Sequence, residues 1–300
     1  MASPSKRVLV TGSGGFTGRH LCAHLRDNGF DVVGLTDHAA PSTHELRADL
    51  TDALAMAGAV RAAAPDYVVH LAAIAFPGHT QAADVYRVNV DGTLNLLQAL
   101  ADSPFGRAGV LLPSTATVYA HAGTSLLRED SPLEPASHYA VSKLAMEHMA
   151  RLFRASLPIT IVRPFNYTGP GQREPYIVPK IVRHFVERAA VIELGNVDVE
   201  REFLDVRAIV DAYCRLLVEP RARGLTLNLC SGRGTTVRRV VEELTRITGH
   251  EIEIRVNPKF VRIGEPQRVI GSNEQVRGLI GDLVDIPLAT TLRDMLGTTT

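Results

Sequence analysis

The feature that most constrains the fold is a glycine-rich turn between a short apolar run and a helical pattern. Val8–Val10 favours a strand, glycines follow at Gly12, Gly15 and Gly18, and a helical pattern continues to about Asn28. Such a turn directs backbone N–H groups and a helix N-terminus at a phosphate. The pattern is typical of a dinucleotide-binding unit, in which the first glycine makes the turn, the second admits the pyrophosphate and the third allows close helix packing.

Strand and helix patterns alternate through the rest of the chain. We expect strands at residues 31–35, 67–71, 110–113, 159–163, 225–229 and 251–256, and helices at residues 53–63, 83–101, 139–155, 177–188, 206–218 and 237–248. This alternation predicts an α/β fold of the Rossmann type, with a doubly wound parallel sheet. Prolines and glycines loosen the pattern after Arg163. We therefore expect residues 1–165 to form an NAD(P)-binding domain carrying the catalytic residues. Residues 166–300 would form mainly a smaller α/β substrate lobe, interleaved with the first.

The end of the second strand indicates which dinucleotide binds. An acidic side chain there bonds the ribose diol of NAD, and its absence leaves room for the 2′-phosphate of NADP. That place falls on Thr36, which favours NADP(H) with Arg19 as a phosphate partner, while Asp37 keeps NAD(H) open. Asp49 and Leu50 follow a further short strand and would meet the adenine. The alternative for Asp49 is a capping role at the next helix.

Charge and cysteine content exclude several partners. Lys plus Arg equals Asp plus Glu, at 32 each, and the basic residues are scattered, so we expect neither nucleic acid nor an anionic membrane as a partner. The three cysteines lack metal-site spacing and are expected to be buried, without a metal or disulfides. The N-terminal residues lack a signal-peptide pattern, and no apolar run would span a membrane. A cytoplasmic protein is the expectation.

Two hydroxyl side chains and a lysine form a candidate catalytic set. Tyr139 and Lys143 lie four residues apart on an expected helix, so they share a face. A nearby ammonium would lower the pKa of Tyr139 from its ordinary ~10 and suit it to proton transfer at a carbinol or carbonyl. Thr115, after an expected strand, would bond the same oxygen. The plain alternatives are a half-exposed tyrosine, a solvated lysine and a turn threonine.

The order of these motifs resembles the extended short-chain dehydrogenases/reductases, the NAD-dependent epimerase/dehydratase family. His70–Ala73 after another strand and Asn89–Thr93 in the long helix extend the resemblance over nearly the whole chain. It implies that Thr115, Tyr139 and Lys143 are catalytic. It also implies the following cofactor-binding set: Gly12, Gly15, Phe16, Thr17, Gly18, Arg19, Thr36, Asp37, Asp49, Leu50, Leu71, Ala72, Ala73, Asn89, Tyr139 and Lys143.

Three later segments resemble the nucleotide-sugar members of this family. In Arg163–Gln172 the resemblance assigns Asn166 to a substrate phosphate, and in Leu194–Val206 it assigns Arg201 to the diphosphate. The alternative for Arg201 is an ion pair with an adjacent glutamate.

The third segment, Asn257–Glu265, resembles an element of GDP-mannose 4,6-dehydratases and GDP-4-keto-6-deoxy-D-mannose reductases. Arg262 and Glu265 would then contact the nucleotide's diphosphate and ribose, although Ile263 stands where that group has proline. A solvated charged loop is the alternative.

The residue two places after Thr115 separates the candidate reactions. The 4,6-dehydratases that this chain resembles carry an acid there, but here it is Thr117, which is no general acid or base. We therefore expect NAD(P)H-dependent reduction of the C4 ketone of a nucleotide-activated, GDP-linked 4-keto-6-deoxy sugar. A 4-epimerase with NAD remains open, as does a non-catalytic NAD(P)-binding sensor. The apolar faces of the helices at 83–101 and 139–155 favour a homodimer, as in related proteins, or simply core packing.

Overall fold

A computed structural model describes residues 5–37, 44–75, 81–120, 126–261 and 266–298. Its main sheet has seven parallel strands in the order β3-β2-β1-β4-β5-β6-β11. These strands are β1 (Arg7–Thr11), β2 (Asp31–Thr36), β3 (Glu45–Arg47), β4 (Tyr67–His70), β5 (Gly109–Pro113), β6 (Ile159–Pro164) and β11 (Thr226–Leu229). The order reverses direction between β1 and β4, so a crevice is expected there, at the carboxyl ends of the strands. The predicted doubly wound parallel sheet is confirmed.

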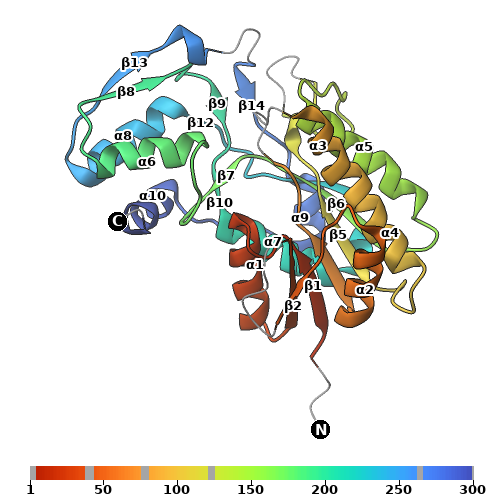
Figure 1. Ribbon diagram of the computed structural model, residues 1–300. Helices are drawn as coiled ribbons and strands as arrows, with labels where there is room; N and C mark the ends of the chain where they lie inside the picture. Colours follow the sequence, from red (N-terminus) through yellow and green to blue (C-terminus); the bar gives the residue numbers. More distant parts are fainter. Residues whose placement is uncertain (1–4, 38–43, 76–80, 121–125, 262–265, 299–300) are drawn as a thin grey trace.

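Helices cover both faces of this sheet (Figure 1). One face carries α1 (Phe16–Asp27), α7 (Val206–Val218) and α9 (Glu274–Ile280), and the other carries α2 (Ala53–Ala63), α4 (Gly92–Ala101) and α5 (His138–Leu152). The alternation of side chains along a strand explains both cores. Val8 and Val10 of β1 pack with the first set of helices, and Leu9 packs with the second.

The helix expected at residues 83–101 is one helical path with a change of pitch. It consists of α3 (Ala82–Tyr86), a π-helical turn η1 (Arg87–Asp91) and α4. The turn places Asn89 in the interior, where its side chain is 1% exposed. The side-chain amide of Asn89 lies on this π-helical turn and bonds the backbone of Ile74. A regular helical pattern in the sequence does not predict the change of pitch.

A second lobe lies beside the carboxyl ends of the strands (Figure 1). Its core joins α6 (Ile177–Val186), α8 (Val237–Thr248) and α10 (Leu288–Thr298) to the paired strands β8 (Val191–Leu194) and β13 (Glu253–Val256). The remaining short elements are β7 (Tyr167–Thr168), β9 (Glu200–Arg201), β10 (Leu204–Asp205), β12 (Thr235–Thr236), β14 (Arg268–Val269), η2 (Ala116–Val118), η3 (Pro220–Ala222) and η4 (Pro258–Phe260). The elements α7 and β11 come from the second half of the chain but belong to the main sheet layer.

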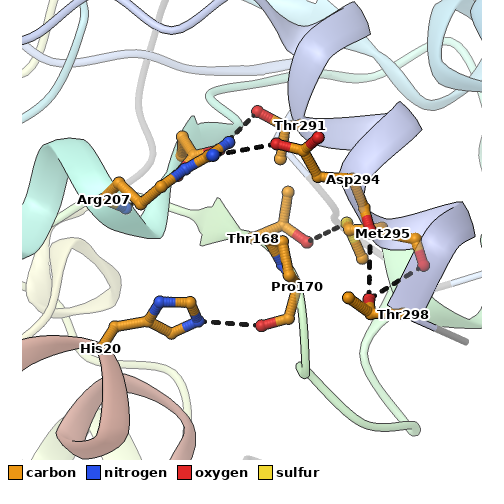
Figure 2. A network of polar contacts seen from close by, with 9 residues as sticks. His20, Thr168, Pro170, Arg207, Thr291, Asp294, Met295 and Thr298 are labelled. Atoms are coloured by element: carbon orange, nitrogen blue, oxygen red, sulfur yellow. Dashed lines mark hydrogen bonds and ion pairs between the residues drawn. The ribbon is translucent and has the colours of Figure 1, made fainter. Parts of the chain in front are cut away.

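No sequence motif predicted helix α10. Its side chains form polar contacts at the junction of the two lobes (Figure 2). Thr291 donates to the buried carboxylate of Asp205 (2.7 Å), and Arg207 pairs with Asp294 (2.8 Å). Nearby, a ring nitrogen of His20 on α1 lies 2.8 Å from the carbonyl oxygen of Pro170. These contacts hold the second lobe against the end of the main sheet.

The three cysteines are buried, as predicted. Within the described ranges no helix is long and apolar enough to cross a membrane. The same ranges contain no group of three or more His, Cys, Asp or Glu side chains arranged to hold a metal ion.

Candidate active site

The glycine turn closes tightly at the carboxyl end of β1. Gly12 has φ +68°, and a Cβ there would lie 2.7 Å from the backbone nitrogen of Ala72. A Cβ on Gly18 would collide with the carbonyl oxygen of Gly12, whereas Gly15 has only that oxygen nearby, at 3.2 Å. Only glycine fits the first and last positions, because the turn packs against the backbone of Ala72 and α1 packs against the turn itself.

The first turn of α1 is joined to the segment after β6. The hydroxyls of Thr17 and Tyr167 lie 2.8 Å apart, and the rings of Phe16 and Tyr167 stack at 6.2 Å. Arg19 donates to the carbonyl of Gly14 (2.7 Å) and also reaches the carbonyl of Gly171 (3.4 Å). These contacts bring residues 167–171 against the glycine turn.

The carboxyl end of β2, where the sequence predicts that NAD and NADP are distinguished, has a basic neighbour which the sequence pattern did not indicate. Thr36 pairs in register with Arg47 of β3, and Arg47 Nε donates to the carbonyl of Asp37 (3.3 Å). The next residues along the chain lie outside the described ranges. The only sequence signal for Arg47 is its place in a three-residue strand, which is too short to fix a register before the fold is known.

The capping alternative for Asp49 is wrong. Asp52 caps α2 by accepting from the backbone nitrogens of Leu54 and Ala55, whereas Asp49 accepts from the nitrogen and hydroxyl of Thr51, both at 2.8 Å. Leu50 is buried, at 8% exposed. Adenine contacts for Asp49 and Leu50 remain a prediction.

The last residue of β4 is a buried, neutral histidine. His70 is held between the hydroxyls of Thr11 (2.7 Å) and Thr93 (2.9 Å), and burial lowers its pKa to about 3. The hydroxyl of Thr11 also accepts a hydrogen bond from the backbone nitrogen of Ala72 (3.1 Å). The backbone carbonyl of Thr11 accepts one from the backbone nitrogen of Leu71 (3.1 Å). The backbone of residues 71–73, predicted to face the cofactor, is thereby fixed to β1.

Asn89 holds the continuation of this segment. Its carbonyl oxygen accepts from Ile74 N (2.8 Å), and its amide donates to Ile74 O (3.1 Å) and to the hydroxyl of Ser142 (3.0 Å). Both amide hydrogens are thus used within the protein. We expect Asn89 to shape the cofactor crevice through the backbone that it fixes, rather than by donating to a cofactor as the resemblance implied.

Thr115 and Tyr139 come together from different elements. Thr115 follows β5 and caps η2, with its hydroxyl 3.0 Å from that of Thr117. Tyr139 is the second residue of α5, whose first turn is capped by Ser137. A hydrogen bond with Thr115 favours the ionised form of the Tyr139 hydroxyl and opposes the effect of burial on its pKa. The two hydroxyls therefore converge at the carboxyl end of β5.

Lys143 lies one turn further along α5, in the interior. Its side chain is 4% exposed, and Nζ donates to the carbonyl oxygen of Pro113 (2.8 Å). Burial lowers the pKa of Lys143 to about 8, although Glu147 opposes that shift. The expected lowering of the Tyr139 pKa is wrong. Burial raises it instead, because a phenolate loses hydration there and the Lys143 ammonium is directed at Pro113.

Two of the four predicted substrate residues lie in the described segments that follow β6. Asn166 is exposed between β6 and β7, and Arg201 is half-buried on β9 with its guanidinium donating to the carbonyl of Glu200 (2.9 Å). The carboxylate of Glu200 pairs with Arg268 (3.1 Å). The buried Glu202 carboxylate instead accepts the backbone N–H of Gly271 (2.8 Å) and donors of Ser231. Arg262 and Glu265 lie outside the described residues.

A family model described as "NAD dependent epimerase/dehydratase family" matches residues 8–230, which include the glycine turn, Thr115, Tyr139 and Lys143. The chain belongs to this family. Two curated relatives of the epimerase/dehydratase protein span almost its whole length. A GDP-6-deoxy-D-talose 4-dehydrogenase from Aggregatibacter actinomycetemcomitans is 36% identical over 92% of each chain. A GDP-6-deoxy-D-mannose reductase from Pseudomonas aeruginosa is 33% identical over 97% of this chain and 96% of that one.

Solved structures of similar proteins agree with the fold and differ in their ligands. A protein described as a candidate epimerase from Burkholderia cenocepacia is 42% identical, with a TM-score of 0.92. RMD from Pseudomonas aeruginosa, complexed with NADPH, is 31% identical with a TM-score of 0.87. MoeE5, complexed with UDP-glucuronic acid and NAD, is 30% identical with a TM-score of 0.87. Each alignment covers 98% of both chains. The epimerase/dehydratase family thus includes close structural neighbours that hold either dinucleotide.

Proposed function

We propose that this chain reduces the C4 ketone of a GDP-linked 4-keto-6-deoxy sugar with NADPH. The observation that carries the proposal is the hydrogen bond between the Thr115 and Tyr139 hydroxyls, with the buried Lys143 one turn further along α5. Thr117 stands where elimination of water would need an acid, and it only adds a third hydroxyl, 3.0 Å from Thr115. The two curated relatives, whose names specify GDP-6-deoxy sugars, support the choice of substrate.

The residues present fit a dinucleotide, because the tight glycine turn sets the N-terminus of α1 at the carboxyl end of β1, and Gly15 at that N-terminus carries no side chain to keep a pyrophosphate away. Bound NADPH would supply the hydride to C4. Tyr139 then gives its proton to the oxygen at C4, so one hydride and one proton convert the ketone to the alcohol. Thr115 hydrogen-bonds the same oxygen as charge develops on it, and Lys143 holds the nicotinamide ribose. The raised pKa of Tyr139 favours the protonated form that a proton donor needs.

We favour NADP(H) over NAD(H) because Thr36 offers no carboxylate to the ribose and Arg47 lies beside it. RMD binds NADPH, which supports this choice, whereas MoeE5 binds NAD. On the substrate side we assign Asn166, Arg201, Arg262 and Glu265 to the nucleotide sugar. Residues 1–165 would thus hold mainly the cofactor, and residues 166–300 mainly the substrate.

An NAD-dependent 4-epimerase is the second candidate. A structural neighbour at 42% identity is described as a candidate epimerase, and MoeE5 holds a UDP-sugar. Epimerisation would use Tyr139 in both directions and would consume no net cofactor.

Absorbance of the reduced nicotinamide tests the proposal. With GDP-4-keto-6-deoxymannose, we expect NADPH oxidation that Tyr139→Phe abolishes. Conversion of a GDP- or UDP-hexose with catalytic NAD, and no NADPH oxidation, would instead support the epimerase. Tight NADP binding without either activity would support the non-catalytic sensor.

We further propose a homodimer that buries the outer faces of α4 and α5. Leu94 on α4 and Val141 and Leu152 on α5 are 40%, 37% and 82% exposed, and a partner subunit on these helices would cover them.

A further inference from the structure

Lys143 carries its charge where water has little access. Its side chain is 4% exposed. Nζ donates hydrogen bonds to the carbonyl oxygen of Pro113 (2.8 Å) and to the sulfur of Met146 (3.9 Å). Both partners are uncharged. An ammonium that is buried among neutral groups is strongly disfavoured relative to the free amine. A further group must therefore support the charge that the proposed reaction uses.

The titratable groups around Lys143 come from three elements. His70 of β4 faces it but is neutral, since burial lowers its pKa to about 3. Arg163 of β6 is a second buried cation. On α5 itself, Tyr139 is protonated, and Glu147 lies one turn beyond Lys143 on the same helix face. Of these neighbours, Glu147 is the anion, and its side chain is fully buried.

The Glu147 carboxylate is fixed by a buried network. Arg163 donates to both of its oxygens, Nε to Oε1 at 2.9 Å and Nη2 to Oε2 at 2.7 Å. The other arm of Arg163 reaches the hydroxyl of Tyr119 (2.9 Å) and the carbonyl of Glu129 (3.2 Å). Tyr119 in turn donates to Asn228 (2.7 Å). The Glu147 carboxylate therefore cannot turn to another partner without breaking its bidentate pair with Arg163.

We propose that Glu147 is a positioning residue, which keeps Lys143 protonated and fixes α5 behind Tyr139. The inference rests on the proposed function only in assigning the charged lysine to the reaction. Glu147 opposes the lowering of the Lys143 pKa that burial causes. Without its negative charge, Lys143 and Arg163 are two buried cations on neighbouring elements, and Lys143 is the one that can release a proton.

The four lysines of the chain, Lys6, Lys143, Lys180 and Lys259, make a direct test possible. NMR of protein labelled with ¹³C at the lysine ε-carbon, with Lys143→Arg to assign the signal, follows the ionisation of Lys143 without substrate. We expect a midpoint near pH 8 in the natural chain. In Glu147→Gln the midpoint should fall by ~1 unit or more, because an opposite charge has been removed. Glu147→Asp, which keeps the charge, should restore most of the shift.

A matched control separates charge from burial. Glu202 is an equally buried carboxylate, but it accepts from the backbone N–H of Gly271 and from Ser231 rather than from a cation. Glu202→Gln should leave the Lys143 midpoint unchanged. If Glu147→Gln does not fold, the double variant Glu147→Met, Arg163→Met removes both charges. Its Lys143 midpoint should still fall below that of the natural chain, because the anion one helical turn from Lys143 is lost. A folded Glu147 variant of either kind with an unchanged Lys143 midpoint overturns the proposal.

The pH profile of turnover gives a second readout. If the chain is a ketoreductase, the alkaline limb of its kcat/KM profile should move to lower pH in Glu147→Gln, by the shift seen in the NMR titration. A loss of activity that is equal at every pH would indicate a purely structural role and would contradict the proposal. If the chain is not a ketoreductase, the NMR titration still tests the role of Glu147. A failure of the proposed function can therefore be told apart from a failure of the proposal for Glu147.

Discussion

Tyr139 is subject to opposing influences on its hydroxyl group. Burial and the neighbouring Tyr167 and Tyr176 raise its pKa, while the hydrogen bond with Thr115 lowers it. Burial is the largest of these effects, so the hydroxyl is protonated at neutral pH. That state suits the donation of a proton to a developing alkoxide, whereas oxidation of an alcohol would require the phenolate.

Replacing Tyr139 should remove this proton without removing the cofactor site. We expect Tyr139→Phe to lower kcat by ~10²–10⁴, the usual contribution of a general acid. Thr115→Val should lower it by roughly 10-fold, because one hydrogen bond to the oxygen is lost. Steady-state kinetics, with NADPH binding as the control for folding, measure both. A Tyr139→Phe variant with the turnover of the natural chain would exclude Tyr139 as the proton donor.

Arg47 is the residue by which the choice of dinucleotide can be tested. If it contacts the 2′-phosphate, Arg47→Leu should weaken NADPH binding by roughly 10-fold or more, with little effect on NADH. Arg19→Leu is the matched variant, since Arg19 already donates to two carbonyl groups. Fluorescence titration with each dinucleotide gives the four dissociation constants. An equal loss of affinity for NADPH and NADH would show that Arg47 does not contact the 2′-phosphate.

At the scale of elements, the junction of β1 and α1 depends on the glycine turn. Gly12 combines a positive φ with a close approach to Ala72, whereas a Cβ on Gly14 would meet nothing within 4 Å. Two neighbouring glycines of one turn therefore have different requirements.

Gly12→Ala and Gly14→Ala should separate these requirements. The first should destabilise the fold by ~1–3 kcal/mol through backbone strain and abolish NADPH binding. The second should keep both properties close to those of the natural chain. Thermal unfolding with and without NADPH reports both effects. Normal binding by Gly12→Ala would show that the turn adapts and that its tightness is not required.

The attachment of α10 depends on one buried carboxylate (Figure 2). Asp205 accepts from Arg207 N (2.7 Å), from the Arg207 guanidinium and from Thr291 (2.7 Å). We expect Asp205→Ala to lower the free energy of unfolding by about 2–4 kcal/mol, as it removes a helix cap and a buried charge partner. Asp294→Ala, which removes only the half-exposed pair with Arg207, should cost below ~1 kcal/mol. Denaturant titration compares the two variants, and equal losses would contradict this account.

The acid limb of stability follows from the same contact. Burial alone would raise the pKa of Asp205, but the hydrogen bonds from Arg207 and Thr291 hold it below the ordinary value of 3.8. The unfolded chain therefore binds this proton more readily. The stabilisation by Asp205 is complete above about pH 4 and is lost as the pH falls through the folded-state pKa.

At the scale of the whole molecule, local patterns predicted the Rossmann sheet and the glycine turn, which the structure confirms, while the shared oxygen of Thr115 and Tyr139 stays a prediction. These features depend on short-range periodicity and on strand order, which a sequence displays directly. The direction of the Tyr139 pKa shift was not predictable, because it depends on burial and on the electrostatic influence of Tyr167 and Tyr176, which come from distant segments. Arg47 was missed for a similar reason, since its position beside Thr36 requires the β2–β3 register.

The proposed dimer makes a prediction about the outer surface of α4 and α5. Val141→Glu should shift the chain from dimer to monomer at micromolar concentration, because it places a charge in an apolar contact. Leu54→Glu is the control, as Leu54 is 85% exposed on α2, outside the proposed contact. Sedimentation equilibrium measures both variants. A natural chain that sediments as a monomer would remove the proposal.

Transfer of deuterium from C4-deuterated NADPH to the sugar tests the central claim most directly. With GDP-4-keto-6-deoxymannose as substrate, we predict one deuterium at C4 of the product for each NADP⁺ formed, detected by mass spectrometry and NMR. The labelled cofactor must carry deuterium on each face in separate experiments, and only one face should transfer it. Product without deuterium from either face, or a hexose isomerised without net cofactor oxidation, would contradict the ketoreductase account.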